Sequence, residues 1–185
     1  GGVLTRWNIE DRRAEESIQL SAKSLRGMDY SIERDEIAIG ASDYNIYIVD
    51  AANFSVKHII KSAHENSVFT VKYHPGQPHL LSGSRDAHLK VWHLNDFREV
   101  SSQPAHWFTI NDIVFNSTGT HFATASRDKT LKIWNAADYT LVKVLETIRD
   151  KGHLNSVNTL YWSKCNNYLL SSGDDRSIII WQMTD

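Results

Sequence analysis

"GSRDAHLKVW", residues 83–92, decides how the whole chain is interpreted, because copies of it recur at a nearly fixed distance. Two close copies are "ASRDKTLKIW" (125–134) and "SGDDRSIIIW" (172–181), and "GASDYNIYIV" (40–49) is a weaker copy upstream. Each copy has an aspartate six residues before a final tryptophan or valine, and these final residues, at positions 49, 92, 134 and 181, are 43, 42 and 47 residues apart. A period of this length indicates one supersecondary unit used several times.

A second motif keeps step with the first. The segments "SAHENSVFTVKYHP", "PAHWFTINDIVFNS" and "KGHLNSVNTLYWSK" each place a histidine 28 residues before the tryptophan of their unit. The extra residues of the last unit precede its histidine, in "ETIRDKGH". We expect a longer outer strand or a loop to accommodate them, because insertions are tolerated outside the packed elements.

Each unit contains short runs of the residue types that favour strands. Examples are "VFTVKY", "LLSG" and "HLKVWHL", preceded by a less apolar segment such as "SVKHII". Turn-forming stretches such as "HPGQP" and "NSTG" separate the runs, so we expect four short strands per unit. No segment shows sustained helical periodicity, and loops this short join only antiparallel neighbours. The sequence therefore predicts an all-β fold built from four-stranded antiparallel sheets.

Composition narrows the class of protein. The 185 residues are 41% hydrophobic and 23% charged, which is ordinary for a globular chain with a substantial core. The net charge of -2 gives no overall basic field, so nucleic acid is not favoured as a partner. The single cysteine, Cys165, excludes a disulfide-stapled secreted scaffold, and we expect the cytoplasm, or the nucleus of a eukaryotic cell. No apolar run approaches the roughly 18 residues of a membrane span, so we expect no membrane partner.

The unit of about 42 residues, the Gly-His or Ala-His pair and the Asp six residues before a Trp together resemble the WD-repeat family of β-propellers. The resemblance is strong over residues 55–185 and weak over 11–54, where Val49 replaces the tryptophan and Ser21 the histidine. It implies a propeller of four-stranded antiparallel blades, with four complete blades and one leading strand in this chain. We assign residues 1–10 to the last strand of a preceding blade, 11–53 to a degenerate WD repeat, and 54–96, 97–138 and 139–185 to WD repeats.

In that family a His, a strand Ser or Thr, a turn Asp and a Trp form a buried hydrogen-bond network within each blade. By position the resemblance implies three such sets: His64, Ser82, Asp86, Trp92; His106, Thr124, Asp128, Trp134; and His153, Ser171, Asp175, Trp181. Serine, histidine and aspartate together also suggest a nucleophilic triad, but a triad occurs once per active site and this set occurs three times. The other histidines lack metal-ligand spacing, and Cys165 has no activating base in the sequence. We therefore expect a structural role, with no catalytic residue, metal or cofactor.

The resemblance also implies that partners bind one face of the propeller, around its central channel. The family's contact positions are three and five residues after the tetrad histidine and the one before the turn Asp. Here the predicted partner-binding residues are Arg26, Ser67, Phe69, Arg85, Asn111, Arg127, Asn158 and Asp174, with Ser24, Ser42, Thr109 and Ser156 at the remaining equivalent positions. Three arginines beside Phe69 suit an acidic or phosphorylated peptide with one apolar anchor. The alternative is that these arginines are solvated and bind nothing.

We thus expect a non-enzymatic protein–protein interaction scaffold that binds a peptide or protein partner. The alternative is the regulatory propeller portion of a larger enzyme whose catalytic domain lies outside this chain. A closed ring needs more blades than these residues supply, which predicts the C-terminal portion of a larger propeller. Its exposed blade faces predict association with the remainder of the propeller or with another copy of the chain.

Overall fold

The structure is a computed structural model that describes residues 1–183, and this part of the chain forms strands joined by short turns. A two-stranded sheet comes first, followed by three four-stranded sheets and a three-stranded one. The strands of these sheets are, in order, β1 (Val3–Asn8) and β2 (Arg13–Gln19); β3 (Leu25–Ser31), β4 (Glu36–Ala41), β5 (Ile46–Asp50) and β6 (Val56–Ile60); β7 (Val68–Tyr73), β8 (His79–Ser84), β9 (His88–His93) and β10 (Glu99–Pro104); β11 (Ile110–Phe115), β12 (His121–Ser126), β13 (Leu131–Asn135) and β14 (Leu141–Leu145); and β15 (Val157–Trp162), β16 (Tyr168–Gly173) and β17 (Ile178–Gln182).

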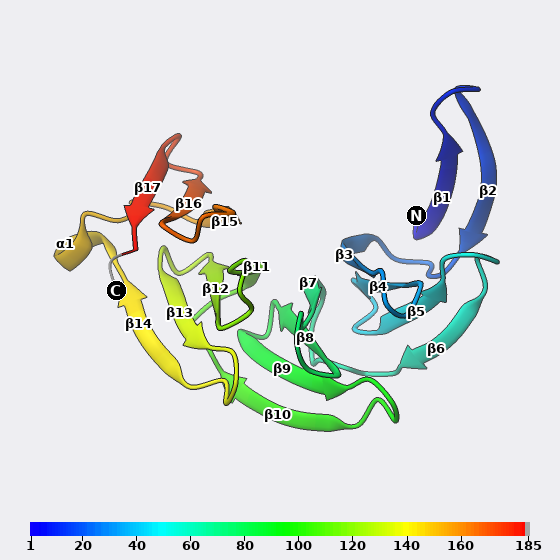
Figure 1. The fold of residues 1–185 in the computed structure, drawn as a ribbon, viewed down its shortest axis with the longest axis horizontal. Helices are drawn as coiled ribbons and strands as arrows, with labels where there is room; N and C mark the ends of the chain where they lie inside the picture. The colour runs from blue at the N-terminus through cyan, green and yellow to red at the C-terminus, as the bar shows by residue number, and fades with distance from the viewer. Residues whose placement is uncertain (184–185) are drawn as a thin grey trace.

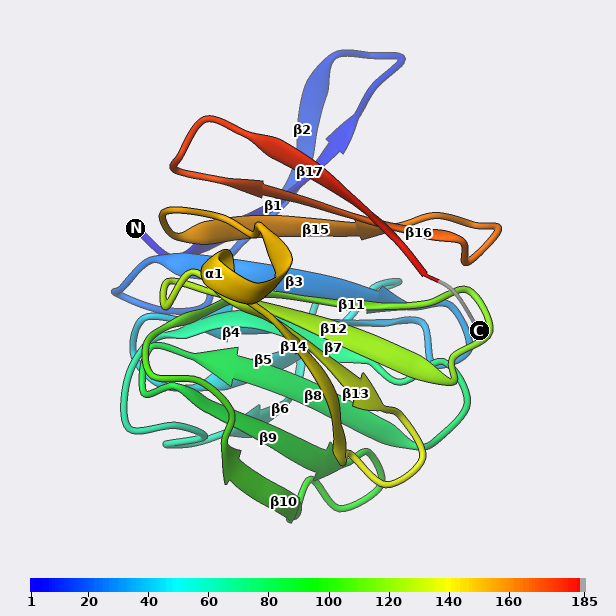
Figure 2. The ribbon, with the colours of Figure 1, turned by 90° about the vertical axis from the view of Figure 1, so that its left-hand side faces the viewer.

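The sheets follow one another along an open arc (Figure 1). In every sheet, strands adjacent in the chain are also paired antiparallel neighbours. The first strand of each larger sheet, β3, β7, β11 or β15, faces the inside of the arc, and β6, β10 and β14 form its outer rim (Figure 1). The first and last sheets both lie at the open side of the arc (Figure 2). The arrangement confirms the predicted all-β propeller fold with four-stranded antiparallel blades.

The distribution of strands among blades differs from the expected four complete blades with one leading strand. Within residues 1–183 only three sheets have four strands, and the leading strand β1 pairs with β2. The reason is an offset between repeat and sheet. The sequence repeat 54–96, for example, begins with β6, which is the outer strand of the preceding sheet, and then supplies β7, β8 and β9. The last two residues of the expected 139–185 repeat lie outside the described range.

The hydrophobic core lies between successive sheets. One buried cluster joins Ile46 and Ile48 of β5 to Val68 and Val71 of β7 and to Trp92 of β9. The next joins side chains of the β7–β10 and β11–β14 sheets, including Leu81, Val91, Ile113, Phe122 and Trp134. Each fully buried aliphatic or aromatic side chain contributes about 1.5–3 kcal/mol relative to exposure. The sheets therefore stabilise one another through these shared clusters.

The turns between the third and fourth strands of the sheets share a feature that was not predicted from the sequence. Phe54, Phe97 and Tyr139 all have a left-handed backbone, with φ of 58°, 54° and 63°. The amide of each donates to the carbonyl of the residue four positions earlier, at 3.0, 2.8 and 2.9 Å. Phe54 and Tyr139 are buried, and Phe97 packs against the cluster that contains Trp92. These turns place aromatic side chains at the edge of the core.

The extra residues of the last repeat form a helical turn instead of the expected longer strand or loop. Helix α1 (Thr147–Asp150) follows β14 and ends at Lys151, which has a left-handed φ of 57°. The Asp150 side chain accepts a hydrogen bond from the amide of Glu146 at 3.0 Å, which closes the turn. In the part of the chain that the structure describes, no helix is long and apolar enough to cross a membrane.

Candidate functional site

A hydrogen-bonded series of four side chains lies inside the β7–β10 sheet. Trp92 Nε1 donates to Ser82 Oγ at 2.9 Å, and Ser82 Oγ lies 2.8 Å from His64 Nε2. His64 Nδ1 lies 2.9 Å from Asp86 Oδ2. Because an ionised carboxylate only accepts, His64 donates from Nδ1 and accepts the Ser82 proton at Nε2. Every polar group of this tetrad therefore has a partner, as burial requires.

The same geometry recurs in the next two sheets. The three distances, taken as His Nδ1 to Asp, His Nε2 to the hydroxyl, and Trp Nε1 to the hydroxyl, are 2.9, 2.7 and 2.9 Å for His106, Asp128, Thr124 and Trp134. They are 3.0, 2.8 and 2.9 Å for His153, Asp175, Ser171 and Trp181. The structure thus brings together all twelve residues of the three expected sets.

Each tetrad ties a turn to a loop. Asp86 accepts a hydrogen bond from the backbone amide of Glu65, the residue after the tetrad histidine, at 2.9 Å. Asp128 accepts from Trp107 in the same way at 3.0 Å. The Ser82 and Thr124 side chains are buried and have no exposed surface, so no substrate reaches these hydroxyls. This geometry fits a structural clasp and not an accessible nucleophile.

The tetrad side chains have shifted acidities with clear physical causes. Burial lowers the pKa of His64 and of His106, and the neighbouring aspartate offsets this only in part. Burial opposes ionisation of Asp86, but the hydrogen bond and charge of His64 and nearby amides lower its pKa to about 2. The pKa of Asp128 is lowered by the corresponding contacts with His106. The folded state thus favours neutral histidine beside ionised aspartate.

These shifts predict that acid destabilises the protein in two stages. Below about pH 6.5, the model-compound value, His64 and His106 bind protons in the unfolded chain before they do so in the folded one, so folding becomes less favourable. Below about pH 4, Asp86 and Asp128 bind protons in the unfolded chain before they do so in the folded one, and this removes a second contribution to stability. We expect the urea concentration at the unfolding midpoint to decrease as the pH is lowered from 7.5 to 5.0. It should decrease again below pH 4.

The double variant His64→Gln/His106→Gln separates the tetrad from other titrating groups. We expect it to be less stable at every pH but to have a shallower slope between pH 7.5 and 5.0. Some slope will persist, because burial also lowers the pKa of His74 and His79. A slope as steep as that of the parent chain would show that the tetrad histidines do not cause the first stage.

The degenerate repeat replaces the tetrad with a different set of satisfied contacts. Ser21 Oγ and Tyr47 Oη both donate to Asp43 Oδ2, at 2.5 and 2.6 Å. Ile39 and Val49, which stand where the hydroxyl residue and the tryptophan are expected, are buried. The polar side chains at the tetrad positions of the β3–β6 sheet, Ser21 and Asp43, therefore have hydrogen-bond partners although the histidine is absent.

The predicted partner-binding positions all lie at one end of the sheets. In four sheets the amide before the turn Asp donates to the carbonyl three residues after the tetrad position, at 2.8–3.0 Å: Ser42 to Ser24, Arg85 to Ser67, Arg127 to Thr109 and Asp174 to Ser156. We call this end, made of these turns and of the loops that precede β3, β7, β11 and β15, the turn face. Equivalent residues of the four sheets share this surface.

The residue five positions after the tetrad histidine occupies a β-bulge in each sheet. Strand pairing passes over Arg26, Phe69, Asn111 and Asn158, where the register shifts by one residue. A bulge leaves one residue out of the ladder and redirects its side chain. The bulge directs Arg26, Phe69 and Asn111 to contacts with a neighbouring sheet, whereas Asn158 contacts the β16–β17 turn of its own sheet.

Several of the predicted residues are already engaged with one another. Arg26 Nε donates to Ser42 Oγ at 2.7 Å, and its guanidinium lies 5.1 Å from the Phe69 ring centroid, in cation–π geometry. Arg26 therefore covers Phe69, the expected apolar anchor. The buried hydroxyl residue Ser67 lies beneath this surface.

The amide side chains of the turn face also have partners within the chain. Asn111 Nδ2 donates across the sheet boundary to the Val157 carbonyl at 2.7 Å and to Ser156 Oγ at 3.1 Å. Asn158 Nδ2 donates to Asp174 Oδ1 at 2.5 Å. Asn111 thus links two blades, and Asp174 is paired with its neighbour.

Arg85 and Arg127 differ from the other predicted residues. Both are exposed, and in residues 1–183 neither guanidinium makes a hydrogen bond or an ion pair. The sequence analysis missed two further exposed residues of this face, Trp107 and Phe108, which directly follow the tetrad residue His106. A difference between repeats could have identified them from the sequence, because Glu65 and Asn66 occupy the equivalent positions one repeat earlier.

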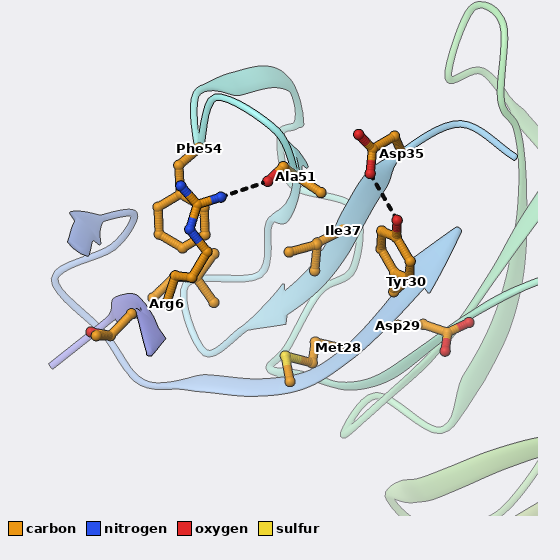
Figure 3. Close-up of a pocket in the computed structure, with 10 residues that line it drawn as sticks. Arg6, Met28, Asp29, Tyr30, Asp35, Ile37, Ala51 and Phe54 are labelled. Atoms are coloured by element: carbon orange, nitrogen blue, oxygen red, sulfur yellow. Dashed lines mark hydrogen bonds between the residues drawn. The ribbon is translucent and has the colours of Figure 1, made fainter. Parts of the chain in front are cut away.

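A groove of about 510 Å³ lies away from the turn-face residues, between β1 and the β3–β6 sheet (Figure 3). Its walls include Leu4, Met28, Tyr30 and Phe54. Arg6 lies 5.2 Å from the Phe54 ring centroid and donates to the Ala51 carbonyl at 3.0 Å (Figure 3). The groove lies between two sheets, and the charged side chains of Arg6, Asp29 and Asp35 line it together with the apolar ones. Across residues 1–183 the structure contains no group of three His, Cys, Asp or Glu side chains placed to hold a metal ion.

Comparison with known proteins agrees with this architecture. The family described as "WD domain, G-beta repeat" matches residues 55–93, 97–135 and 142–182. The chain is similar to the nuclear distribution protein PAC1 of Candida albicans, with 32% identity over 150 residues, which is 77% of this chain and 30% of that protein. It is also similar to the F-box-like/WD repeat-containing protein TBL1X of Mus musculus, with 32% identity over 139 residues, 68% of this chain and 25% of that protein.

The 26S proteasome regulatory subunit RPN14 of Saccharomyces cerevisiae is 26% identical over 108 residues, 55% of this chain and 26% of that protein. The chain thus spans less than a third of each of these relatives. Its three matched segments, by contrast, cover more than half of its own length. With the propeller sheets and the repeated tetrads, they show that the chain belongs to the WD-repeat family.

Proposed function

We propose that this chain is a protein-interaction scaffold whose turn face binds an acidic or phosphorylated segment of another protein. Membership of the WD-repeat family supports the general role, because the family consists largely of interaction scaffolds and the relatives include a proteasome regulatory subunit. The observation that carries the specific proposal is the pair of exposed guanidinium groups of Arg85 and Arg127, which have no hydrogen-bond or ion-pair partner among residues 1–183. They occupy equivalent positions in two neighbouring sheets.

The backbone brings the two arginine turns onto one surface. The amides of Ala105 and His106, in the loop before β11, both donate to the Ala87 carbonyl, at 3.0 and 3.2 Å. The turn that carries Arg85 therefore touches the loop that is bonded to the Arg127 turn.

Arg85 and Arg127 present positive charge to solvent, although the whole chain has a net charge of -2. Asp86 and Asp128 sit beside the two arginines, but their carboxylates are directed inward to His64 and His106. A guanidinium presents a planar fork of donors that matches a carboxylate or phosphate. Two such groups on one surface suit a segment with two or more negative charges.

The double variant Arg85→Glu/Arg127→Glu tests this proposal. We expect it to bind a labelled pool of acidic peptides, with and without phosphoserine, at least about 10-fold more weakly, because truncating one charge-assisted contact commonly costs 10-fold or more. Fluorescence anisotropy measures the affinity. Binding of the parent chain should also weaken as salt is raised from 50 to 300 mM.

Arg98→Glu/Lys164→Glu is the matched control. It reverses two exposed charges on loops at the opposite end of the strands, one of them the partner of Asp96 at 3.1 Å. This control should bind the acidic pool as the parent does. Equal binding by the two double variants would contradict the proposal.

We further propose that the remainder of a propeller, or another copy of the chain, is a second partner, and that the protein acts in the cytoplasm or nucleus. The exposed apolar side chains on the sheets at both ends of the arc support this partner.

A further inference from the structure

The turn face carries one cluster that the other repeats lack. Trp107 and Phe108 are 85% and 58% exposed, and they lie in the loop between β10 and β11. Large apolar side chains with this exposure on a folded protein mark contact surfaces when they are grouped and rimmed by polar residues.

Hydrogen bonds to the backbone of the loop fix the pair between the two arginine turns. On one side, the loop is bonded to the Arg85 turn through the Ala87 carbonyl. On the other side, the Trp107 amide donates to Asp128, and Ser126 Oγ donates to the Phe108 carbonyl at 3.2 Å. The aromatic pair is thus flanked by the turns that carry Arg85 and Arg127.

The β12–β13 turn adds a further cation. Lys129 is exposed and follows Asp128 with a left-handed φ of 76°. Asp128 turns its carboxylate inward to His106, so Arg127 and Lys129 are the charges that this turn presents to solvent. Two exposed aromatic rings therefore lie beside a doubly basic turn.

Comparison of the repeats shows that the fold does not require this cluster. The positions of Trp107 and Phe108 hold Glu65 and Asn66 in one neighbouring repeat and Leu154 and Asn155 in the other. All three loops make the same amide-to-aspartate hydrogen bond. The two aromatic residues are thus not needed to build the loop, which leaves their exposed rings free for a partner.

We infer that Trp107 and Phe108 form an apolar anchoring site for a protein segment in which a large apolar residue lies next to acidic residues. The segment's carboxylates contact Arg85, Arg127 and Lys129, and its apolar side chain packs on the two rings. The charges on both sides of the rings select such a segment over a purely apolar one. This inference rests on the proposed function and adds the apolar determinant, because Phe69 is covered by Arg26.

The test uses two pools of labelled acidic heptapeptides with the same charge. The central residue is Leu, Phe or Trp in the apolar pool and Ser or Gly in the plain pool. We expect the parent chain to bind the apolar pool about 10-fold or more tightly than the plain pool, as expected for burial of one such side chain. The variant Trp107→Ser/Phe108→Asn should bind both pools alike, at the affinity of the plain pool.

Two controls locate the effect. Leu154→Ser changes the equivalent exposed residue of the next repeat and should keep the preference for the apolar pool. Arg85→Glu/Arg127→Glu should weaken binding of both pools. Circular dichroism and the urea midpoint show that each variant folds as the parent does.

The outcomes distinguish this inference from the proposed function. If the parent binds both pools equally, the anchoring site is wrong and the acidic-segment scaffold stands. If it binds neither pool, both are wrong. Binding to vesicles of phosphatidylcholine and phosphatidylserine that requires Trp107 and Phe108, without a preference for the apolar pool, would assign the cluster to a lipid surface and overturn the inference.

Discussion

Replacing Trp134 by alanine is expected to lower the free energy of unfolding by about 3–5 kcal/mol. The side chain is only 3% exposed and belongs to the cluster between the β7–β10 and β11–β14 sheets. It stacks on Phe122 with ring centroids 6.1 Å apart, and its Nε1 donates to Thr124 Oγ1 at 2.9 Å. Alanine removes both the packing and the donor. Urea unfolding followed by far-ultraviolet circular dichroism measures the loss.

Two further variants separate the causes. Trp134→Phe keeps most of the ring packing but removes the N–H donor, so it should cost less than the alanine variant, with about 1–3 kcal/mol from the lost partner. Trp181→Ala changes the equivalent residue of the last sheet, which is only half-buried. Its effect should be clearly smaller than that of Trp134→Ala. Equal losses at the two tryptophans would mean that packing between sheets does not set the size of the effect.

The 185-residue chain by itself is expected to self-associate at micromolar concentration. Tyr161, Leu170 and Ile180 form a row across the last sheet, because Tyr161 pairs with Leu170 and Leu170 with Ile180. On the exposed face of β17, Ile178 and Ile180 are 72% and 64% accessible. Met28 and Tyr30 of β3 are exposed in the sheet that follows the two-stranded sheet at the other end of the arc. Apolar surfaces of this kind promote association, so sedimentation velocity should show species larger than the 21.1 kDa chain.

The variant Ile178→Lys/Ile180→Lys should shift this equilibrium toward the monomer, with association about 10-fold weaker or more, because charged side chains oppose pairing at an open sheet edge. The control Val100→Lys/Val142→Lys introduces the same charges at exposed valines of the outer strands β10 and β14. It should leave the association largely unchanged. A parent chain that sediments as a monomer at every concentration would contradict the prediction.

Much of the fold follows from the periodicity of the sequence. The segments "VFTVKY" and "INDIVF" coincide with β7 and β11, because alternating apolar residues between turn formers define a half-buried strand. Helix α1 was not predicted, because a count of extra residues does not reveal that Asp150 can close a turn on the Glu146 amide. The aromatic turns were detectable, since Phe54, Phe97 and Tyr139 are 43 and 42 residues apart, but the residue type gave no sign of the left-handed backbone.

The positions of the candidate site residues could be predicted from the sequence, but their contacts could not. The repeat register placed Arg26 and Asn111 at equivalent bulge positions of two sheets and Arg127 at the position before the turn Asp, and the structure has all three on the turn face. The repeat register did not reveal that Arg26 stacks on Phe69. Nor did it reveal that Asn111 donates a hydrogen bond to Ser156, 45 positions away. Those contacts cross a sheet boundary, where the angle and spacing between sheets decide which side chains meet.

The sequence by itself determined the repeated unit, its strands and the residue types of the three tetrads, since these depend on contacts within about 30 residues inside one repeat. The tertiary structure alone decided how the strands divide among sheets and which turn-face residues remain free for a partner. Among the described residues Arg85 and Arg127 have no side-chain partner, whereas Arg26 donates to Ser42 and lies over the Phe69 ring of the next sheet. The physical reason is that packing between sheets creates neighbours that no spacing within a single repeat records.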